Sequence, residues 1–223
     1  MKLYKKIIIV ITGIAILITG ILCKQEFFLM IPLFISLFVM AFQSEANRIG
    51  PLMGSINSLL YAGCYIYMGV YLSAVQALLL SFPIQLITFF RWKKNAYKKT
   101  AVFKKMSAKT RIVFSVCVLA LWATLAGVCY YLNYEYAILD SILFLLGVIV
   151  QILTMFAFIE YTYLWIVQAV IGLFLNVQMV FVDPKETTYL VYGVYALYCV
   201  IGAFISVQKF YKEQQQEKSA ISE

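Results

Sequence analysis

The chain contains no histidine, and only 13% of its 223 residues are charged. A typical soluble domain has about 25% charged residues. The absence of histidine removes the commonest metal ligand and general base. No cluster of carboxylates takes its place, so the sequence lacks an acid–base or metal constellation. We therefore expect no enzyme, no cofactor and no metal site.

Cysteine is also sparse, with five residues scattered singly along the chain. Four of them lie well inside apolar runs, and their spacing matches neither a disulfide framework nor a zinc site. We interpret them as small residues embedded in a membrane. The five are Cys23, Cys64, Cys117, Cys129 and Cys199.

Long apolar runs dominate the remaining sequence, of which 64% is hydrophobic. A helix that spans a bilayer needs about 20 mostly apolar residues. By this criterion eight spanning helices are predicted, at 5–23, 27–43, 50–68, 70–90, 112–132, 138–158, 162–182 and 188–208. The chain is thus expected to be an all-α integral membrane protein in contact with the lipid bilayer.

The positive charge is concentrated in one stretch, since residues 91–111 hold nine of the 18 Lys and Arg residues. A net charge of +8 could indicate a nucleic-acid partner, but these residues lie between membrane spans, and we expect no nucleic acid. Cytoplasmic loops of membrane proteins are rich in Lys and Arg. With eight spans and both termini in the cytoplasm, all basic residues except Lys24 and Lys185 face inward. The sequence therefore predicts a plasma-membrane protein whose residues 91–111 form a cytoplasmic loop.

The chain also resembles itself. An offset of 115 places Glu160 on Glu45, and an offset of 118 places residues 209–212 on residues 91–94. Three helices in each unit, separated by one linker helix, would make the two repeats parallel, as in some transporters. The predicted architecture is an extra N-terminal helix (1–24), a first three-helix repeat (25–94), a basic loop and linker helix (95–136), a second repeat (137–212) and a polar, disordered tail (213–223).

Polar side chains inside predicted spans are costly and therefore informative. Asn57 and Tyr61 share one helical face because they are four residues apart. Further amides occur at Gln151, Gln168 and Asn176. These groups favour a water-accessible cavity, although each amide could instead form an interhelical hydrogen bond that only joins helices. No acidic residue lies deep in a predicted span, which fits facilitated diffusion better than ion-coupled transport.

The segment from Asn47 to Asn57, with Leu60-Tyr61 and Arg91-Trp92, resembles the first repeat of the PnuC family of vitamin transporters. Asp140, Gln151, Glu160 and Trp165 resemble the second repeat. The family continues its signature as Glu-x-Trp-x-x-Trp-x-x-x-Asn, whereas this chain has Thr162 and Ala169 at two of those positions. These departures leave the identity of the vitamin open.

The resemblance implies a fold like that of the SWEET sugar transporters, a homotrimer, and uptake of a small vitamin by alternating access without direct energy coupling. Nicotinamide riboside and thiamine both carry a cationic aromatic ring, which Trp or Tyr can bind by cation–π contact. We expect Trp165 to stack on the ring and Gln151, Gln168 and Asn57 to form hydrogen bonds, with Asn176 and Tyr61 as second choices. A riboflavin carrier, a substrate-binding subunit of an energised importer and a structural membrane protein remain alternatives.

Overall fold

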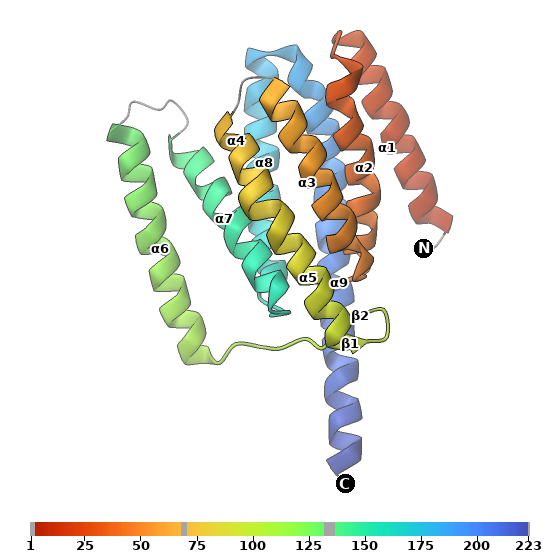
Figure 1. Cartoon of the computed structure of the whole chain (residues 1–223), viewed down its shortest axis with the longest axis vertical. Coiled ribbons are helices and arrows are strands. Elements are labelled where there is room, and N and C mark those ends of the chain that lie inside the picture. The colour runs from red at the N-terminus through yellow and green to blue at the C-terminus, as the bar shows by residue number, and fades with distance from the viewer. Residues whose placement is uncertain (1–2, 68–70, 132–136, 223) are drawn as a thin grey trace.

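The computed structural model of the chain describes residues 3–67, 71–131 and 137–222 (Figure 1). Apart from one two-stranded hairpin, the regular structure of these residues is helical. The long helices are α1 (Leu3–Leu22), α2 (Phe27–Gln43), α3 (Ile49–Tyr67), α5 (Phe82–Lys94), α6 (Ala108–Tyr131), α7 (Ala137–Met155), α8 (Tyr161–Val182) and α9 (Thr187–Ser222). The shorter elements are α4 (Tyr71–Gln76), the π-helical turn η1 (Ala77–Ser81), the strands β1 (Ala96–Tyr97) and β2 (Thr100–Ala101), and the 3₁₀ turn η2 (Pro184–Glu186).

The described chain contains eight long helical segments. The elements α4, η1 and α5 count as one of them, because they follow one another without a break. Each segment overlaps one of the predicted spans, and α2 has the predicted bounds of 27–43, whereas α7 ends at Met155 and not at the predicted residue 158. By length and composition, five helices are long and apolar enough to cross a membrane, while α2 and residues 141–155 of α7 are shorter apolar helices. The predicted boundary at residue 136 lies outside the described residues.

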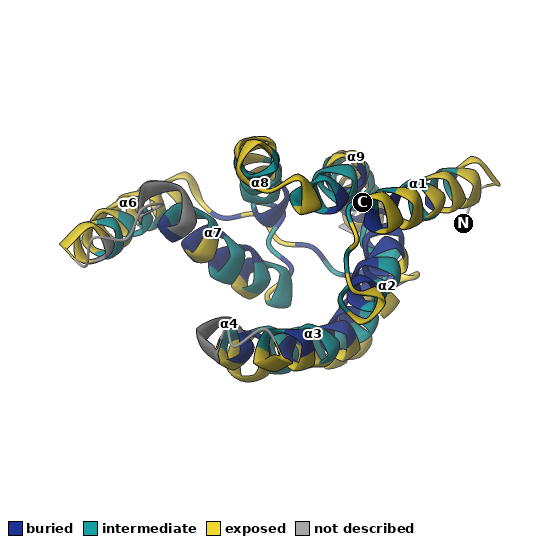
Figure 2. Ribbon diagram, turned by 90° about the horizontal axis from the view of Figure 1, so that it is seen from above, coloured by how far each residue is buried: buried dark blue, intermediate teal, exposed yellow. Residues whose placement is uncertain are grey.

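Six of these helices form a closed ring (Figure 2). Around the ring, α2 contacts α3, α3 contacts α5, α5 contacts α7, α7 contacts α8, α8 contacts α9, and α9 returns to α2. The other two helices pack outside it, α1 against α2 and α9, and α6 against α7. Below, α2, α3 and α5 are called one set, or one half, of the ring, and α7, α8 and α9 are called the other.

The first helix of each set ends in the same kind of turn. Ala46 follows α2 with a φ of 49°, and Ala157 follows α7 with a φ of 56°. In both turns the next amide reaches back five residues, from Asn47 N to Phe42 O and from Phe158 N to Leu153 O. Such a left-handed residue commonly ends a helix, although glycine usually occupies the position. The two turns correspond at an offset of 111, so the backbone repeats close to, but not at, the offset of 115 that pairs Glu45 with Glu160.

Residues 95–107, which we call the linking segment, cross the end of the bundle that carries most Lys and Arg residues, here called the basic end (Figure 1). The segment is bound to both of these turns. At the first, Arg48 N donates to Lys99 O, at 3.1 Å. At the second, Lys104 N donates to Ala157 O and Ile159 N donates to Lys104 O, both at 2.9 Å.

The two matched glutamates hold the linking segment in place. Glu45 forms ion pairs with Lys99 at 2.9 Å and with Lys5 at 3.5 Å. Burial alone would raise the pKa of the Glu45 carboxyl, but the hydrogen bond and charge of Lys99 and the charge of Lys5 outweigh it and lower this pKa. Glu160 accepts a hydrogen bond from Met106 N, at 3.0 Å. Of the loop predicted at 91–111, residues 91–94 belong to α5 and residues 108–111 to α6. The linking segment between them is structured, because both halves of the ring supply partners for it.

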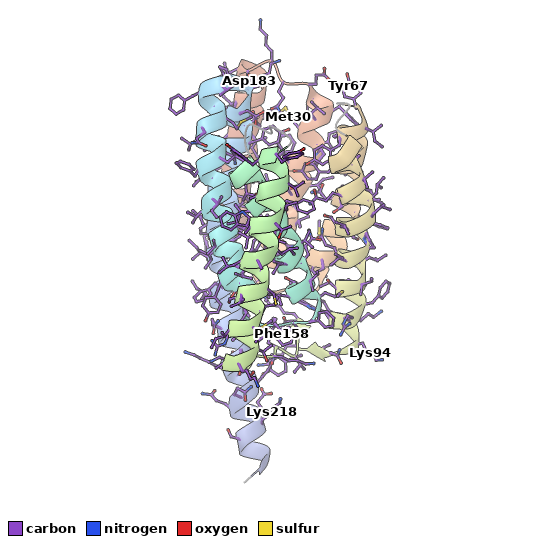
Figure 3. All side chains as sticks on the ribbon, turned by 90° about the vertical axis from the view of Figure 1, so that its left-hand side faces the viewer. Met30, Tyr67, Lys94, Phe158, Asp183 and Lys218 are labelled. Carbon is purple, nitrogen blue, oxygen red and sulfur yellow. The ribbon has the colours of Figure 1, made fainter. Side chains whose placement is uncertain are left out.

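The prediction of a disordered tail from Glu213 is wrong. Helix α9 continues to Ser222 and extends beyond the basic end, where Lys218 is labelled in Figure 3. Gln214 is only 4% exposed, accepts from Phe103 N at 2.9 Å and donates to Ala101 O at 3.0 Å. Lys98 of the hairpin forms an ion pair with Glu213 at 2.7 Å. The polar residues that suggested disorder are thus the partners of the linking segment.

We predict that Gln214→Leu lowers the free energy of unfolding by about 1–3 kcal/mol, because two buried backbone groups lose their partner. Hydrogen exchange at the Phe103 amide should accelerate as well. Gln215→Leu is the matched control, since Gln215 is exposed. Equal unfolding midpoints and equal exchange rates in the two variants would show that Gln214 does not fix the linking segment.

Candidate functional site

A cavity of about 270 Å³ lies inside the ring. All six ring helices contribute to its wall, so it lies between the two sets of three helices. The polar and aromatic lining residues are Ser36, Gln43, Asn47, Asn57, Ser58, Tyr61, Gln85, Thr88, Trp92, Gln151, Thr154, Tyr161, Trp165, Gln168 and Tyr192. The 21 described residues that line the cavity include no Asp, Glu, Lys or Arg. The cavity is therefore suited to a ligand held by amides and rings rather than by an ion pair.

Five of the six residues predicted from the sequence line this cavity. They are Asn57, Tyr61, Gln151, Trp165 and Gln168. Asn176 does not line it and instead donates to the carbonyl of Tyr189, at 3.3 Å, which joins α8 to α9. Of the two departures from the family signature, Thr162 is fully buried and donates to Ile159 O, and Ala169 packs in an apolar cluster with α9 residues. Neither of these two residues lines the cavity.

One wall holds a chain of hydroxyl and amide groups from α2 and α3. Asn57 Nδ2 donates to Ser36 Oγ at 2.7 Å, and this hydroxyl lies 3.3 Å from Tyr61 OH. Asn57 is 5% exposed, and its Oδ1 has no hydrogen-bond partner in the described chain. A buried carbonyl oxygen without a partner is costly. The acceptor capacity of this oxygen is therefore unused among the described residues.

The facing wall has a second such acceptor on α7. Gln151 Nε2 donates to Ser81 Oγ at 3.2 Å, while Gln151 Oε1 is buried without a partner among the described residues. Ser81 ends the π-helical turn η1, two residues before Pro83. Proline cannot donate a backbone hydrogen bond, and π-helical turns are frequent at functional sites. This irregular turn next to Pro83 thus lies where η1 meets Gln151 of α7.

Two glycines make room for amide side chains in the cavity. A Cβ on Gly54 would collide with the carboxamide of Gln85, whose Nε2 donates to Ser58 Oγ at 3.1 Å. A Cβ on Gly147 would lie 3.1 Å from Gln168 Nε2. A Cβ at Gly54 would displace the end of the Gln85 side chain, whereas one at Gly147 would shift Gln168 by only a few tenths of an ångström. Both glycines therefore contribute to the cavity's shape.

Aromatic rings form the end of the cavity nearest the basic end. The rings of Tyr161 and Trp165 lie 6.2 Å apart at an angle of 40°. Trp92 donates from Nε1 to Thr154 O at 2.8 Å, joining α5 to α7, and its ring meets Phe103 of the linking segment edge-on. Trp92 and Tyr161 belong to one buried cluster with Phe103. Trp92 therefore lines this end of the cavity, and Phe103 of the linking segment packs against it.

Sequence reasoning did not select several lining residues, among them Ser36, Ser58, Gln85, Trp92, Tyr161 and Tyr192. Gln85 and Tyr192 lie in predicted spans, but nothing in the sequence indicates in which direction their side chains point. The spacing Gly54, Ser58, Tyr61 provides a signal, because steps of three or four place small and polar residues on one helical face. Ser36 stands alone in an apolar helix, and its role depends on contacts with α3.

The chain is similar to a known family of transporters and to a solved structure. The sequence profile of the family described as nicotinamide mononucleotide transporter matches residues 26–208. A solved structure titled as the crystal structure of the vitamin B3 transporter PnuC shares the fold, with a TM-score of 0.77 and 15% sequence identity over 96% of this chain and 94% of that one. No curated protein sequence matches the chain significantly. The family match covers most of the chain, from just before α2 to residue 208 within α9. The chain therefore belongs to the nicotinamide mononucleotide transporter (PnuC) family of membrane transporters.

Proposed function

We propose that the protein carries a small vitamin with a cationic aromatic ring, either nicotinamide riboside-like or thiamine-like, through the central cavity. The observation that supports this best is the pair of buried, unpartnered oxygens, Asn57 Oδ1 and Gln151 Oε1, on opposite walls of an uncharged cavity. Two orphan acceptors call for a ligand with N–H or O–H donors, such as a carboxamide, an aminopyrimidine or a hydroxyl group. Trp165 and Tyr161 supply the aromatic face for the ring.

The composition of the cavity also favours a riboside over its phosphate ester. A phosphate group carries more than one negative charge near neutral pH, and burying it without a cation is costly. The described lining residues include no Lys or Arg. Ligand pockets usually measure about 300–1,000 Å³, so a cavity of about 270 Å³ suits a small vitamin such as nicotinamide riboside or thiamine better than the larger riboflavin.

In this proposal Trp165 stacks on the ring, and Gln151, Gln168 and Asn57 form hydrogen bonds with the ligand. Tyr61 orients Ser36 and Asn57. Asn176 has no part in binding, because its amide joins α8 to α9. Transport follows from rocking residues 25–94 against residues 137–212, the two parallel repeats of a SWEET-like arrangement, with α6 as linker. Opening toward the basic end would require the Trp92–Thr154 hydrogen bond and the contacts of the linking segment to part.

Orientation and assembly complete the proposal. The Lys and Arg residues gathered at the basic end support placing that end, and both termini, in the cytoplasm. Because none of the described lining residues is charged, the cavity contains no carboxylate that could carry a proton, and we propose facilitated diffusion. The homotrimer implied by the family resemblance can be measured by native mass spectrometry in detergent.

A ligand screen with uptake measurements tests the function. Nicotinamide riboside or thiamine should raise the melting temperature of the purified protein, since a ligand that binds only the folded state stabilises it; nicotinamide mononucleotide should not. The same ligand should enter proteoliposomes down its own gradient alone. Strict dependence on a proton or sodium gradient would contradict facilitated diffusion, and binding without uptake would favour an importer subunit.

We predict that Trp165→Ala weakens binding of the transported vitamin by roughly 30-fold, the equivalent of about 2 kcal/mol for a desolvated cation–π contact. Calorimetry on the purified variant measures this. Trp122→Ala is the matched control, since Trp122 lies on α6 outside the ring and does not line the cavity. Equal affinities in the two variants would exclude Trp165 as the stacking residue.

A further inference from the structure

A second cavity, of about 280 Å³, opens at the basic end outside the ring. The end of α5, the β1–β2 hairpin and the turn after α7 form its walls. Arg91 and Lys94 contribute from α5, Lys104 from the linking segment, and Met155 and Phe156 from the end of α7. Trp92 lines this cavity as well as the central one, so its side chain separates the two. The substrate path proposed above runs through the central cavity and does not use this second cavity.

The second cavity is positively charged without compensation. Its described lining includes three cations and no carboxylate, and neither Arg91, Lys94 nor Lys104 has an ion-pair partner within 4.0 Å in the described chain. The acidic groups nearby serve other cations: Glu45 pairs with Lys99 and Glu213 with Lys98. Three cations that converge on one concave site without a counter-ion favour an anionic ligand.

An apolar surface continues from this pocket along the bundle. Arg91 lies over the ring of Phe156, at 4.3 Å from its centroid, and Phe156 is 39% exposed. Ile152 precedes Phe156 by one turn of α7 and is exposed too. On α5, Phe90 is exposed and lies one turn before Lys94, on the same helical face. The site therefore combines a cationic pocket with adjoining apolar helix faces.

We propose that this pocket binds the phosphate of an anionic phospholipid, with acyl chains lying along the exposed apolar residues of α5 and α7. Arginine and lysine both bind phosphate oxygens by charge-assisted hydrogen bonds. Basic pockets at the cytoplasmic side of membrane helices are typical headgroup sites. Because α5 and α7 belong to opposite halves of the ring, a bound headgroup contacts both halves at the point where Trp92 joins them.

Native mass spectrometry of the full-length protein with added phosphatidylglycerol or phosphatidylcholine tests the proposal. Wild type should retain phosphatidylglycerol preferentially. The variant Arg91→Gln/Lys94→Gln/Lys104→Gln should retain it roughly 100-fold more weakly, the loss expected for three cations near a membrane surface. Lys93→Gln/Lys105→Gln/Lys109→Gln is the matched control, because it removes the same charge from the same stretch but from outside the pocket.

The possible results separate clearly. Loss of retention in the pocket variant alone supports the site, and equal loss in both variants would mean that general surface charge is sufficient, which overturns it. No preference of wild type for phosphatidylglycerol also overturns it, as does a melting-temperature shift with inorganic phosphate but none with the lipid. Lys94→Gln/Lys104→Gln, which keeps Arg91 on Phe156, gives the same test if the triple variant fails to fold. Uptake of the vitamin is not a readout here, so the outcome is independent of the proposed transport function.

Discussion

Gly54→Leu should reduce vitamin uptake to the background of protein-free liposomes. Gly54 lies on the cavity face of α3, and any Cβ there would collide with the carboxamide of Gln85 and lie 3.5 Å from Val39. A leucine would have to displace Gln85 from Ser58 and fill part of a cavity of only about 270 Å³. Inserting extra carbons into a packed site costs about 1–3 kcal/mol, so the variant should still fold while its ligand site is blocked.

Gly63→Leu is the control for this prediction. Gly63 lies on the same helix, is exposed, and an added Cβ there would have no atom within 4 Å. The control variant should transport at the wild-type rate. The measurement is uptake of radiolabelled vitamin into proteoliposomes that contain equal amounts of each variant. If Gly54→Leu transports as well as Gly63→Leu, then the cavity between the two halves is not the substrate path.

Trp92→Ala should destabilise the protein by about 3–5 kcal/mol, the usual cost of deleting a buried large aromatic side chain. Trp92 is 3% exposed, packs against Phe103 and holds Thr154 O through its indole nitrogen. The same deletion should also connect the central cavity with the pocket at the basic end, since Trp92 lines both. The central cavity would then be open at the end where Trp92 lines it.

Two measurements check this prediction. Denaturant titration in detergent gives the free energy of unfolding, and Trp92→Phe should lose only about 1–3 kcal/mol, because it keeps a ring but leaves Thr154 O without its donor. In a cysteine-free background, a charged thiol reagent should modify Thr154→Cys much faster when Trp92 is alanine than when it is phenylalanine. Equal costs and equal labelling rates for the two substitutions would mean that Trp92 is not the partition.

Hydropathy predicted the helices well because burial in lipid or in the ring requires long apolar segments, as the match at α2 illustrates. It did not predict the end of α9. The run from Glu213 is polar, and its order depends on partners more than 100 positions earlier, such as Phe103 and Ala101. Local composition does not contain such distant contacts, so the tail was predicted to be disordered.

In the candidate site, too, the sequence indicates only part of the arrangement. Gln168 and Asn176 both lie on α8 and carry the same chemistry, yet only Gln168 reaches the cavity. They are eight residues apart, which separates them by about 12 Å along a helix. Sequence periodicity indicates which face of a helix points inward. The position along the helix at which a cavity forms depends on how the helices on the other side of the ring pack. Gly147, which makes room for Gln168, lies on a different helix.

Helix α9 touches the central cavity at Tyr192 and the linking segment at Gln214 without an interruption between them. The 22 residues that separate these contacts make a rod about 33 Å long. A tilt of about 10° around Tyr192 would therefore displace Gln214 by about 6 Å, far more than a hydrogen bond of about 3 Å can follow. A small rotation of α9 at the cavity is thus geometrically sufficient to break the hydrogen bonds between Gln214 and the linking segment. The uninterrupted helix therefore links the shape of the cavity to the contacts at the basic end.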